Sequence, residues 1–317
     1  MHTPLWRTCF LALGLSLLAG AALAADPAAD ATPPAGDSER LLPDKEQERM
    51  IALAASQPAS TTPLWLETQH ESYLALYQPA NRPQPRGGVL LLPHDRTSPD
   101  WPGAMQTLRR GLPDKGWHTL AIALPDEPLP LLPRFESASD AATSNEESPL
   151  QDHYLRISQR IETALAALRE RGATKIYLIG EGSGGYWTNR YVSEHLGEQL
   201  YPILIDASEP NTAVQPLHQL TDALSMPALD LYHGDGLGQT AAARAAKLRA
   251  DAARRAGHSS YFSVRMPPQA DDWRQTDPRL LSLISGMIDK RLEAASQPQP
   301  QPEPEPARGQ QRPGRRG

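Results

Sequence analysis

The sequence is poor in cysteine and in long apolar runs, and each shortage excludes a class of protein. Its 317 residues contain one cysteine, Cys9, so the chain cannot form an internal disulfide or a metal site of several thiolates. No later stretch reaches the roughly 20 apolar residues that span a bilayer, so we expect a protein that is not transmembrane. The formal net charge of −6 argues against a nucleic-acid-binding surface.

The first 24 residues are typical of a secretory signal peptide. Arg7 precedes an apolar stretch over residues 10–18, and small residues follow, which places the cleavage between Ala24 and Ala25. Cys9 lies inside this segment, so the mature chain is expected to contain no thiol. We therefore expect export to the periplasm of a Gram-negative bacterium.

Composition divides the remaining chain into three parts. Residues 25–62 contain an Ala/Pro-rich linker and then a short helical pattern, and residues 63–294 contain the apolar strands and helices. Residues 295–317 are rich in Pro, Gln, Glu and Arg, and they bury too little apolar surface to offset the entropy of ordering. We expect one folded domain over 63–294, a mobile insert over 125–149 and a disordered C-terminal tail.

The folded part alternates short apolar strands with amphipathic helices. Alternation on both sides of residues 68–71 predicts a β-hairpin. Six strands follow, at 89–92, 119–124, 176–179, 203–206, 229–232 and 261–266. Because strands joined by helices form crossover connections, the sheet should be mostly parallel and covered on both faces. The prediction is an α/β fold with an eight-stranded, mostly parallel sheet and no large lid domain.

One glycine-rich segment carries the pattern of an active site. Residues 175–185 read Lys-Ile-Tyr-Leu-Ile-Gly-Glu-Gly-Ser-Gly-Gly, which predicts a strand, a sharp turn and the start of a helix, the context of a nucleophile elbow. With the hairpin and the six strands, residues 64–292 resemble the α/β-hydrolase family. They are similar to exported proteobacterial α/β-hydrolase-like proteins grouped as a family of unknown function. The resemblance implies the fold and no particular substrate.

The elbow departs from the family pattern at its tip. Gly180 and Gly184 match the flanking glycines of Gly-x-Ser-x-Gly-Gly, so Gly182 stands at the nucleophile position and Ser183 one position later. The tip residue adopts a positive φ, which costs a residue with a side chain about 1–3 kcal/mol and glycine little. The sequence therefore predicts that the turn is kept while the hydroxyl and the strain are lost.

The other catalytic positions implied by the resemblance are incomplete. The family's histidine should fall within residues 267–273, which contain none. Asp235 follows the preceding strand, where the family has its acid, with a turn-forming role as the alternative. In the oxyanion loop Asp95 replaces a glycine, and its charge would oppose a developing oxyanion. His94, just before it, is either a structural residue or a catalyst.

Three hypotheses about function follow. In the first, the protein is non-catalytic or weakly active and binds a small molecule or an envelope protein through six rim residues: His94, Glu181, Gly182, Ser183, His233 and Asp235. In the second, Ser183 is a displaced nucleophile that acts with Asp235 and either His94 or His233 on an ester or cell-envelope substrate. In the third, the tail binds a structural partner. A distance from Ser183 Oγ to any imidazole nitrogen well beyond about 3 Å favours the first hypothesis over the second.

The sequence gives little support to a dinucleotide-binding site or a metal site. Gly180, Gly182 and Gly185 match the dinucleotide pattern Gly-x-Gly-x-x-Gly, and Asp206 follows at a suitable distance, but the match lies on the third strand of the series instead of opening the fold. The histidines and carboxylates at the strand ends include no pair with the close spacing of a zinc site. We expect no metal and no cofactor, and the sequence does not indicate an oligomeric state.

Overall fold

The structure, a computed structural model, describes residues 45–128, 147–234, 237–268 and 277–296. The chain divides into two units, residues 1–43 and 44–317, and everything described below belongs to the second. The predicted signal peptide, Asp235 and most of the insert over 125–149 lie outside the described residues. Of the tail predicted over 295–317, residues 295 and 296 belong to the last described helix and the rest lies outside. No helix of the described residues is long and apolar enough to cross a membrane.

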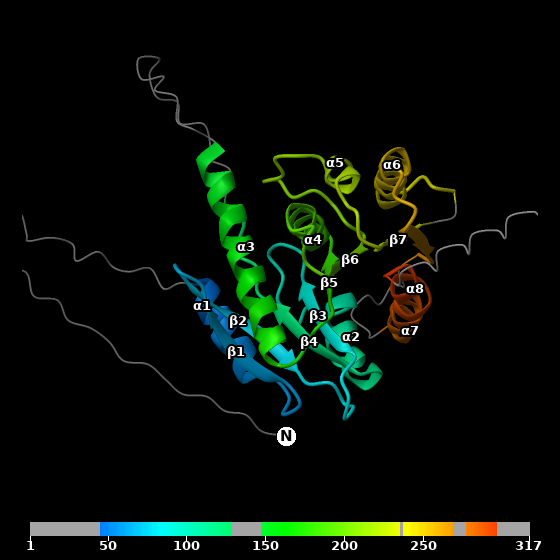
Figure 1. The fold of residues 1–317 in the computed structure, drawn as a ribbon. Coiled ribbons are helices and arrows are strands. Elements are labelled where there is room, and N and C mark those ends of the chain that lie inside the picture. The colour runs from blue at the N-terminus through cyan, green and yellow to red at the C-terminus, as the bar shows by residue number, and fades with distance from the viewer. Residues whose placement is uncertain (1–44, 129–146, 235–236, 269–276, 297–317) are drawn as a thin grey trace, which may run out of the picture. The chain divides into compact units, whose positions relative to one another are not determined.

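The described residues build one sheet with helices on both faces (Figure 1). The strands are β1 (Thr62–Glu67), β2 (Ser72–Gln78), β3 (Gly87–Leu92), β4 (Trp117–Ile122), β5 (Ile176–Glu181), β6 (Leu200–Ile205), β7 (Ala228–His233) and β8 (Tyr261–Met266). The helices are α1 (Lys45–Ala55), α2 (Ala104–Gly111), η1 (Leu112–Lys115), α3 (Glu147–Glu170), α4 (Ser183–Glu194), α5 (Leu217–Asp222), α6 (Ala241–Arg255), α7 (Pro278–Met287), η2 (Ile288–Leu292) and α8 (Glu293–Ser296).

The strand order is β1-β2-β4-β3-β5-β6-β7-β8. The pairs β1–β2 and β2–β4 are antiparallel, and every other pair is parallel. The carboxyl ends of β3 and β5 to β8 therefore meet at one edge of the sheet, which is where open α/β sheets bind ligands. The predicted eight-stranded, mostly parallel α/β sheet is confirmed.

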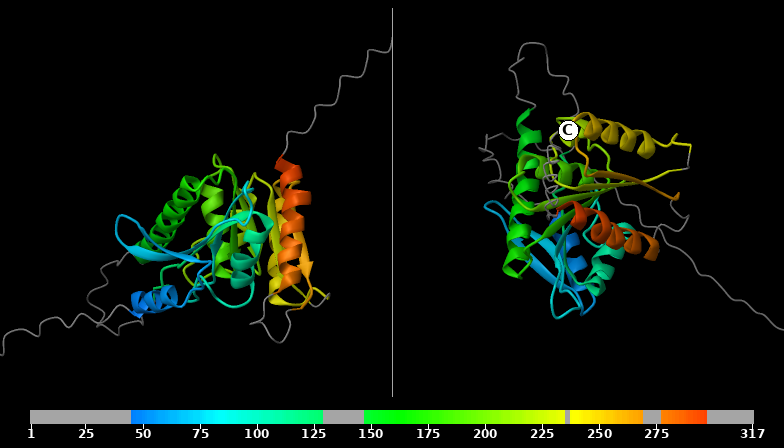
Figure 2. Two further views of the ribbon diagram at one scale, coloured as in Figure 1. Left: turned by 90° about the horizontal axis from the view of Figure 1, so that it is seen from below. Right: turned by 45° about the vertical axis from the view of Figure 1, so that its right-hand side comes forward.

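Two apolar layers cover the sheet. One contains buried side chains of α3, α4 and α5, such as Ile161, Trp187 and Leu217, and the other contains those of α2, α7 and η2, such as Leu108 and Ile284. The view from below shows α3 and α7 on opposite sides of the molecule (Figure 2). Because both faces are covered, the central strands are apolar throughout, which fixes the sheet as a rigid support for the residues at its edge.

Some predicted bounds differ from the observed ones. The strand predicted at 119–124 is β4, Trp117–Ile122, and the strand predicted at 203–206 is β6, Leu200–Ile205. Asp206 therefore follows β6 and lies outside the ladder. The short helix α5 was not predicted, because six residues are too few to show a helical period.

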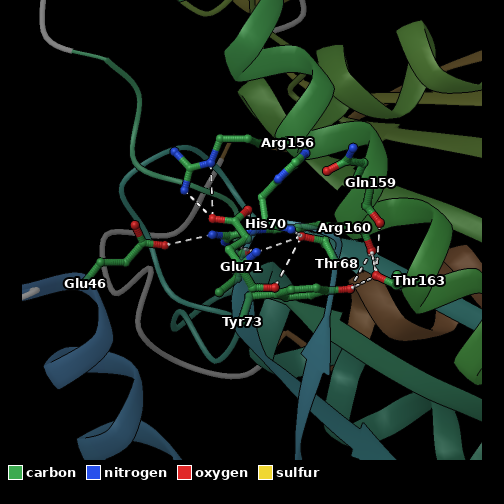
Figure 3. A network of polar contacts seen from close by, with 10 residues as sticks. Glu46, Thr68, His70, Glu71, Tyr73, Arg156, Gln159, Arg160 and Thr163 are labelled. Atoms are coloured by element: carbon green, nitrogen blue, oxygen red, sulfur yellow. Dashed lines mark hydrogen bonds and ion pairs between the residues drawn. The ribbon is translucent and has the colours of Figure 1, made fainter.

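A polar network fastens the β1–β2 hairpin to α3 and α1 (Figure 3). The Glu71 carboxylate receives hydrogen bonds from Arg160 Nε at 2.8 Å and from Arg156. Arg160 also donates to Ala123 O at 2.8 Å and pairs with Glu46 at 3.3 Å. Burial alone would raise the pKa of Glu71, but the hydrogen bonds and charges of the two arginines lower it to about 2.

We predict that Glu71→Gln destabilises the protein at neutral pH. A carboxylate whose folded pKa is depressed stabilises the fold above its unfolded value near 4.5, and this stabilisation is lost as the pH falls through about 2. Since the Glu71 side chain is 17% exposed and its partner Arg156 is 42% exposed, solvent screens part of the interaction and we expect only about 1–2 kcal/mol at pH 7. Urea titrations between about pH 2 and pH 7 should show the wild-type advantage shrinking towards zero in acid.

Glu170→Gln is the matched control, since Glu170 lies exposed at the end of α3. We expect its stability to follow that of wild type at every pH. A Glu71→Gln deficit that does not change with pH would contradict the assignment, because loss of packing rather than charge would then explain it.

Candidate functional site

The sharp turn between β5 and α4 requires glycine, and hydrogen bonds to the end of β6 and to the residues after it fix its position. Gly182 has φ 56° and ψ −123°, a conformation that residues with a side chain rarely adopt. Its N–H donates to Ile205 O at 2.9 Å, and its carbonyl accepts from Ser208 N at 3.0 Å. A Cβ on Gly180 would lie 2.2 Å from Gly184 O, so the turn also requires glycine for close approach. This geometry is that of a nucleophile elbow with no side chain at its tip.

The imidazole of His94 occupies the space above Gly182. His94 follows β3, and a Cβ added to Gly182 would lie 2.5 Å from His94 Nδ1 and 3.1 Å from its Cγ. Even a methyl group at the tip would therefore collide with the ring. The sequence predicted the loss of the nucleophile, but it did not predict that another side chain takes its place.

Ser183, the displaced serine, is completely buried at the start of α4. Its hydroxyl accepts the Asp95 N–H at 2.8 Å and contacts His94 Nδ1 at 3.0 Å. By distance alone, this contact meets the condition for the serine-hydrolase hypothesis. Burial weighs against it, because an attacking hydroxyl must also reach a substrate. In this conformation Ser183 ties the loop after β3 to the first turn of α4.

Both backbone donors of the expected oxyanion hole are used inside the protein. In this fold the hole is formed by the N–H after the nucleophile and by an N–H from the loop after β3. The Ser183 N–H donates to His94 Nδ1 at 3.0 Å, and the Asp95 N–H donates to Ser183 Oγ. The described elbow therefore offers neither of these amides to an oxyanion, and each loss of such a donor typically costs 10²–10³ in rate.

The Asp95 side chain is the carboxyl group for which the sequence predicted an unfavourable charge beside the elbow. It is buried, and its Oδ1 accepts Trp187 Nε1 at 3.3 Å. Burial raises the pKa of Asp95, hydrogen bonds from Ser183 and Trp187 lower it, and the charge of Glu127 raises it further. The expectation that this carboxyl opposes an oxyanion at the elbow stays a prediction.

A second polar cluster lies at the same edge, at the ends of β5, β6 and β7. His233 is the last residue of β7, and its Nδ1 contacts Asp206 Oδ2 at 2.5 Å. Its backbone N–H donates to the other oxygen of the same carboxylate at 2.8 Å. The double contact fixes the ring, and Nε2 has no hydrogen-bond partner among the residues that the structure describes. The hydrogen bond to Asp206 raises the pKa of His233, although burial opposes the shift.

Glu181, the last residue of β5, completes this cluster. Strand alternation directs Glu181 and His233 to the face of the sheet that α2 and α7 cover, because Ile179 and Leu231 belong to that core layer. Burial raises the pKa of Glu181 to about 7, helped by the charge of Asp206 and opposed by that of His233. Its Oε2 is buried without a hydrogen-bond partner in the described part of the chain.

The structure thus separates the six predicted rim residues. His94, Gly182 and Ser183 form one group over the elbow, Glu181 and His233 belong to the other, and Asp235 lies outside the described residues. Asp206 was considered only as a possible cofactor or metal contact, and it holds His233. It has φ 46°, which among the described non-glycine residues only Arg96 shares in sign. An aspartate directly after an apolar strand was the available signal, but a side-chain contact between two strand ends cannot be read from spacing.

The described residues contain no group of three or more histidine, cysteine or acidic side chains that could hold a metal ion. The dinucleotide interpretation of the glycines also fails on geometry. The first two glycines pack against α4 and β6 in a turn whose tip is covered by His94, so the backbone at that point is not open to a pyrophosphate.

The sheet order, the covered faces and the strand-turn-helix at Gly182 together define an α/β-hydrolase-fold protein with an altered elbow. The chain belongs to the family DUF3530, described as a protein of unknown function, whose model matches residues 6–290. The resemblance to α/β-hydrolases and to a family of unknown function is thereby confirmed.

The chain is similar to solved structures at low sequence identity. The chain is similar to dienelactone hydrolase from Anabaena variabilis, with 15% identity, a TM-score of 0.50 and coverage of 74% of this chain and 99% of that chain. It is also similar to XC6422 from Xanthomonas campestris, described as an α/β serine hydrolase without lid, with 15% identity, a TM-score of 0.45 and coverage of 75% and 96%. A comparison with curated proteins finds no match.

We predict that Gly182→Ala is strongly destabilising and that His94 causes part of the loss. The positive φ should cost about 1–3 kcal/mol, and the collision with the imidazole adds to it. In a double-mutant cycle measured by chemical denaturation, adding His94→Ala should recover at least about 1 kcal/mol of the loss.

Gly257→Ala is the matched control, because Gly257 has φ 73° and nothing within 4 Å of its added Cβ. Gly257→Ala should lose the stability that a positive φ costs alanine, without the further loss caused by a collision. Its effect on stability should be additive with that of His94→Ala. Strict additivity of Gly182→Ala and His94→Ala, within about 0.5 kcal/mol, would contradict the placement of the ring.

Proposed function

We propose that the protein is an exported, ligand-binding relative of the α/β-hydrolases that has lost serine-based hydrolysis. The observation that carries the proposal is the elbow itself. The tip is a glycine covered by His94, and the nearest hydroxyl is buried. The first 24 residues support export to the periplasm, since they have the order of a secretory signal peptide. The ligand is a small molecule or part of an envelope protein.

The carboxyl edge of the sheet supports binding there. The cluster of Glu181, Asp206 and His233 lies where open α/β sheets receive ligands. It also contains titratable groups with shifted pKa values, which gather at functional sites more often than elsewhere. The hydrolases of similar fold supply no ligand by analogy, because function depends on the site and not on the fold.

A serine hydrolase acting on an ester or cell-envelope substrate is the second candidate. The contact of 3.0 Å between Ser183 Oγ and His94 Nδ1 favours it, since a nucleophile needs a base within hydrogen-bond reach. It ranks second for two reasons. The same nitrogen accepts the Ser183 N–H, and the loop after β3 would have to move before a substrate could reach the hydroxyl.

The two candidates differ in the reaction of Ser183 with a fluorophosphonate probe. We expect the purified protein to show no labelling above that of Ser183→Ala, because a completely buried hydroxyl cannot reach the phosphorus of the probe. Intact-mass spectrometry measures the adduct, and an active serine hydrolase in the same tube controls for probe quality. Labelling that disappears in Ser183→Ala would overturn the proposal and establish the second candidate.

A further inference from the structure

Glu181 lacks the counter-charge that several other carboxylates of the described residues have. Asp95 lacks one too, but its Oδ1 accepts Trp187 Nε1 at 3.3 Å. Asp230 is fully buried and receives two hydrogen bonds from Arg249, at 2.8 and 2.9 Å. Glu71 pairs with two arginines in the same manner, and Asp100 pairs with Arg109. These pairs follow the general rule, because an ionised group withdrawn from water needs a counter-charge or hydrogen bonds.

No lysine or arginine among the described residues forms an ion pair with Glu181. Its Oε2 is withdrawn from solvent without a partner, while the residue as a whole is partly exposed. Part of Glu181 is therefore open to solvent at the edge of the sheet. The neighbouring positive group, His233, is already engaged by Asp206.

We propose that Glu181, beside the Asp206–His233 pair, binds an organic cation that carries N–H donors, such as the ammonium or guanidinium group of a ligand. This inference rests on the proposed function and gives its ligand a chemical class. The cation would supply to Glu181 the counter-charge and hydrogen bonds that Arg249 supplies to Asp230.

The charges around the cluster support a cation over an anion. Asp206 lies after β6, and Asp277, which precedes α7, acts electrostatically on His233. Together with Glu181 these are three carboxyl groups against one imidazole. An anionic ligand would meet repulsion from the carboxylates, whereas a cation would be attracted and held by charge-assisted hydrogen bonds.

Binding should depend on pH through Glu181. Its pKa is raised to about 7 by burial and by the charge of Asp206, against the effect of His233. A cation binds the ionised form, so binding releases a proton, and the apparent affinity should rise about tenfold between pH 6 and pH 8. Loss of the His233 proton as the pH rises would act in the same direction, because it removes a positive charge from the site.

The test uses NMR on the full chain, labelled with ¹³C and ¹⁵N, at about pH 8 and about pH 6. Methylammonium chloride is titrated against sodium chloride at matched ionic strength. We expect saturable shifts of the Glu181 carboxyl carbon and the His233 ring nitrogens, with the half-saturating concentration about tenfold lower at the higher pH. Methylguanidinium should reproduce the shifts. Tetramethylammonium, which has no N–H, should not.

Glu181→Gln should abolish the shifts at His233. Glu209→Gln is the matched control, because Glu209 lies at the same edge, its Oε1 accepts Leu217 N at 2.8 Å, and the amide oxygen of glutamine can still do so. It should bind methylammonium as wild type does. A readout that needs no variant is the Glu181 titration in wild type, whose midpoint should fall when methylammonium is present.

Three results would each overturn the proposal. They are the absence of saturable shifts from methylammonium, equal shifts in Glu181→Gln and wild type, and equal shifts from tetramethylammonium. The fluorophosphonate experiment reports only whether Ser183 reacts with the probe, so a failure of cation binding leaves its outcome unchanged.

Discussion

The hydrogen bond from the Ser183 N–H to His94 Nδ1 is the contact on which the altered elbow depends. It uses the first amide of α4, which would otherwise face a ligand or an oxyanion. It also holds the imidazole over Gly182, where a nucleophile's side chain would stand. The serine hydroxyl contacts the same nitrogen and accepts the Asp95 N–H. The two backbone donors expected of an oxyanion hole are therefore both used inside the protein.

The carboxyl edge of the sheet also contains a strained residue, Asp206, and a polar cluster beside the altered elbow. The tip of the elbow is relaxed by glycine, while Asp206 keeps a positive φ one strand away. Such conformations persist where the surrounding structure fixes them, and they gather at functional sites. Here the fixed residue orients His233 next to a carboxyl group that has no counter-charge among the described residues. This arrangement supports the proposal that the edge recognises a ligand through charge and hydrogen bonds.

The fold could be predicted from the sequence because its signals are local. Apolar strands of four to six residues, helices with a regular period and a glycine-rich turn after β5 each follow from neighbours in the chain. The same locality explains why Gly182 was identified at the tip of the elbow. Strand ends were less exact, as at Asp206, since a fully buried strand and the residues beside it share the same apolar composition.

The contacts of the site could not be predicted, because they join residues far apart in the sequence. His94 and Ser183 are 89 positions apart, and Asp206 and His233 are 27 apart. Sequence spacing placed all of them at one edge, but it could not show that they form two groups. Nor could it show that Ser183 is buried, since a small polar residue after a turn is usually exposed.

The most direct test of this account is the state of the His94 ring in solution. Long-range ¹H–¹⁵N correlation spectra distinguish the two nitrogens of an imidazole and show which one carries the proton. Because Nδ1 accepts the Ser183 N–H, we expect the ring proton on Nε2 and a slowly exchanging Ser183 amide that is coupled to Nδ1. A proton on Nδ1, together with a Ser183 amide that exchanges rapidly with water, would show that the ring does not hold the elbow in the way described.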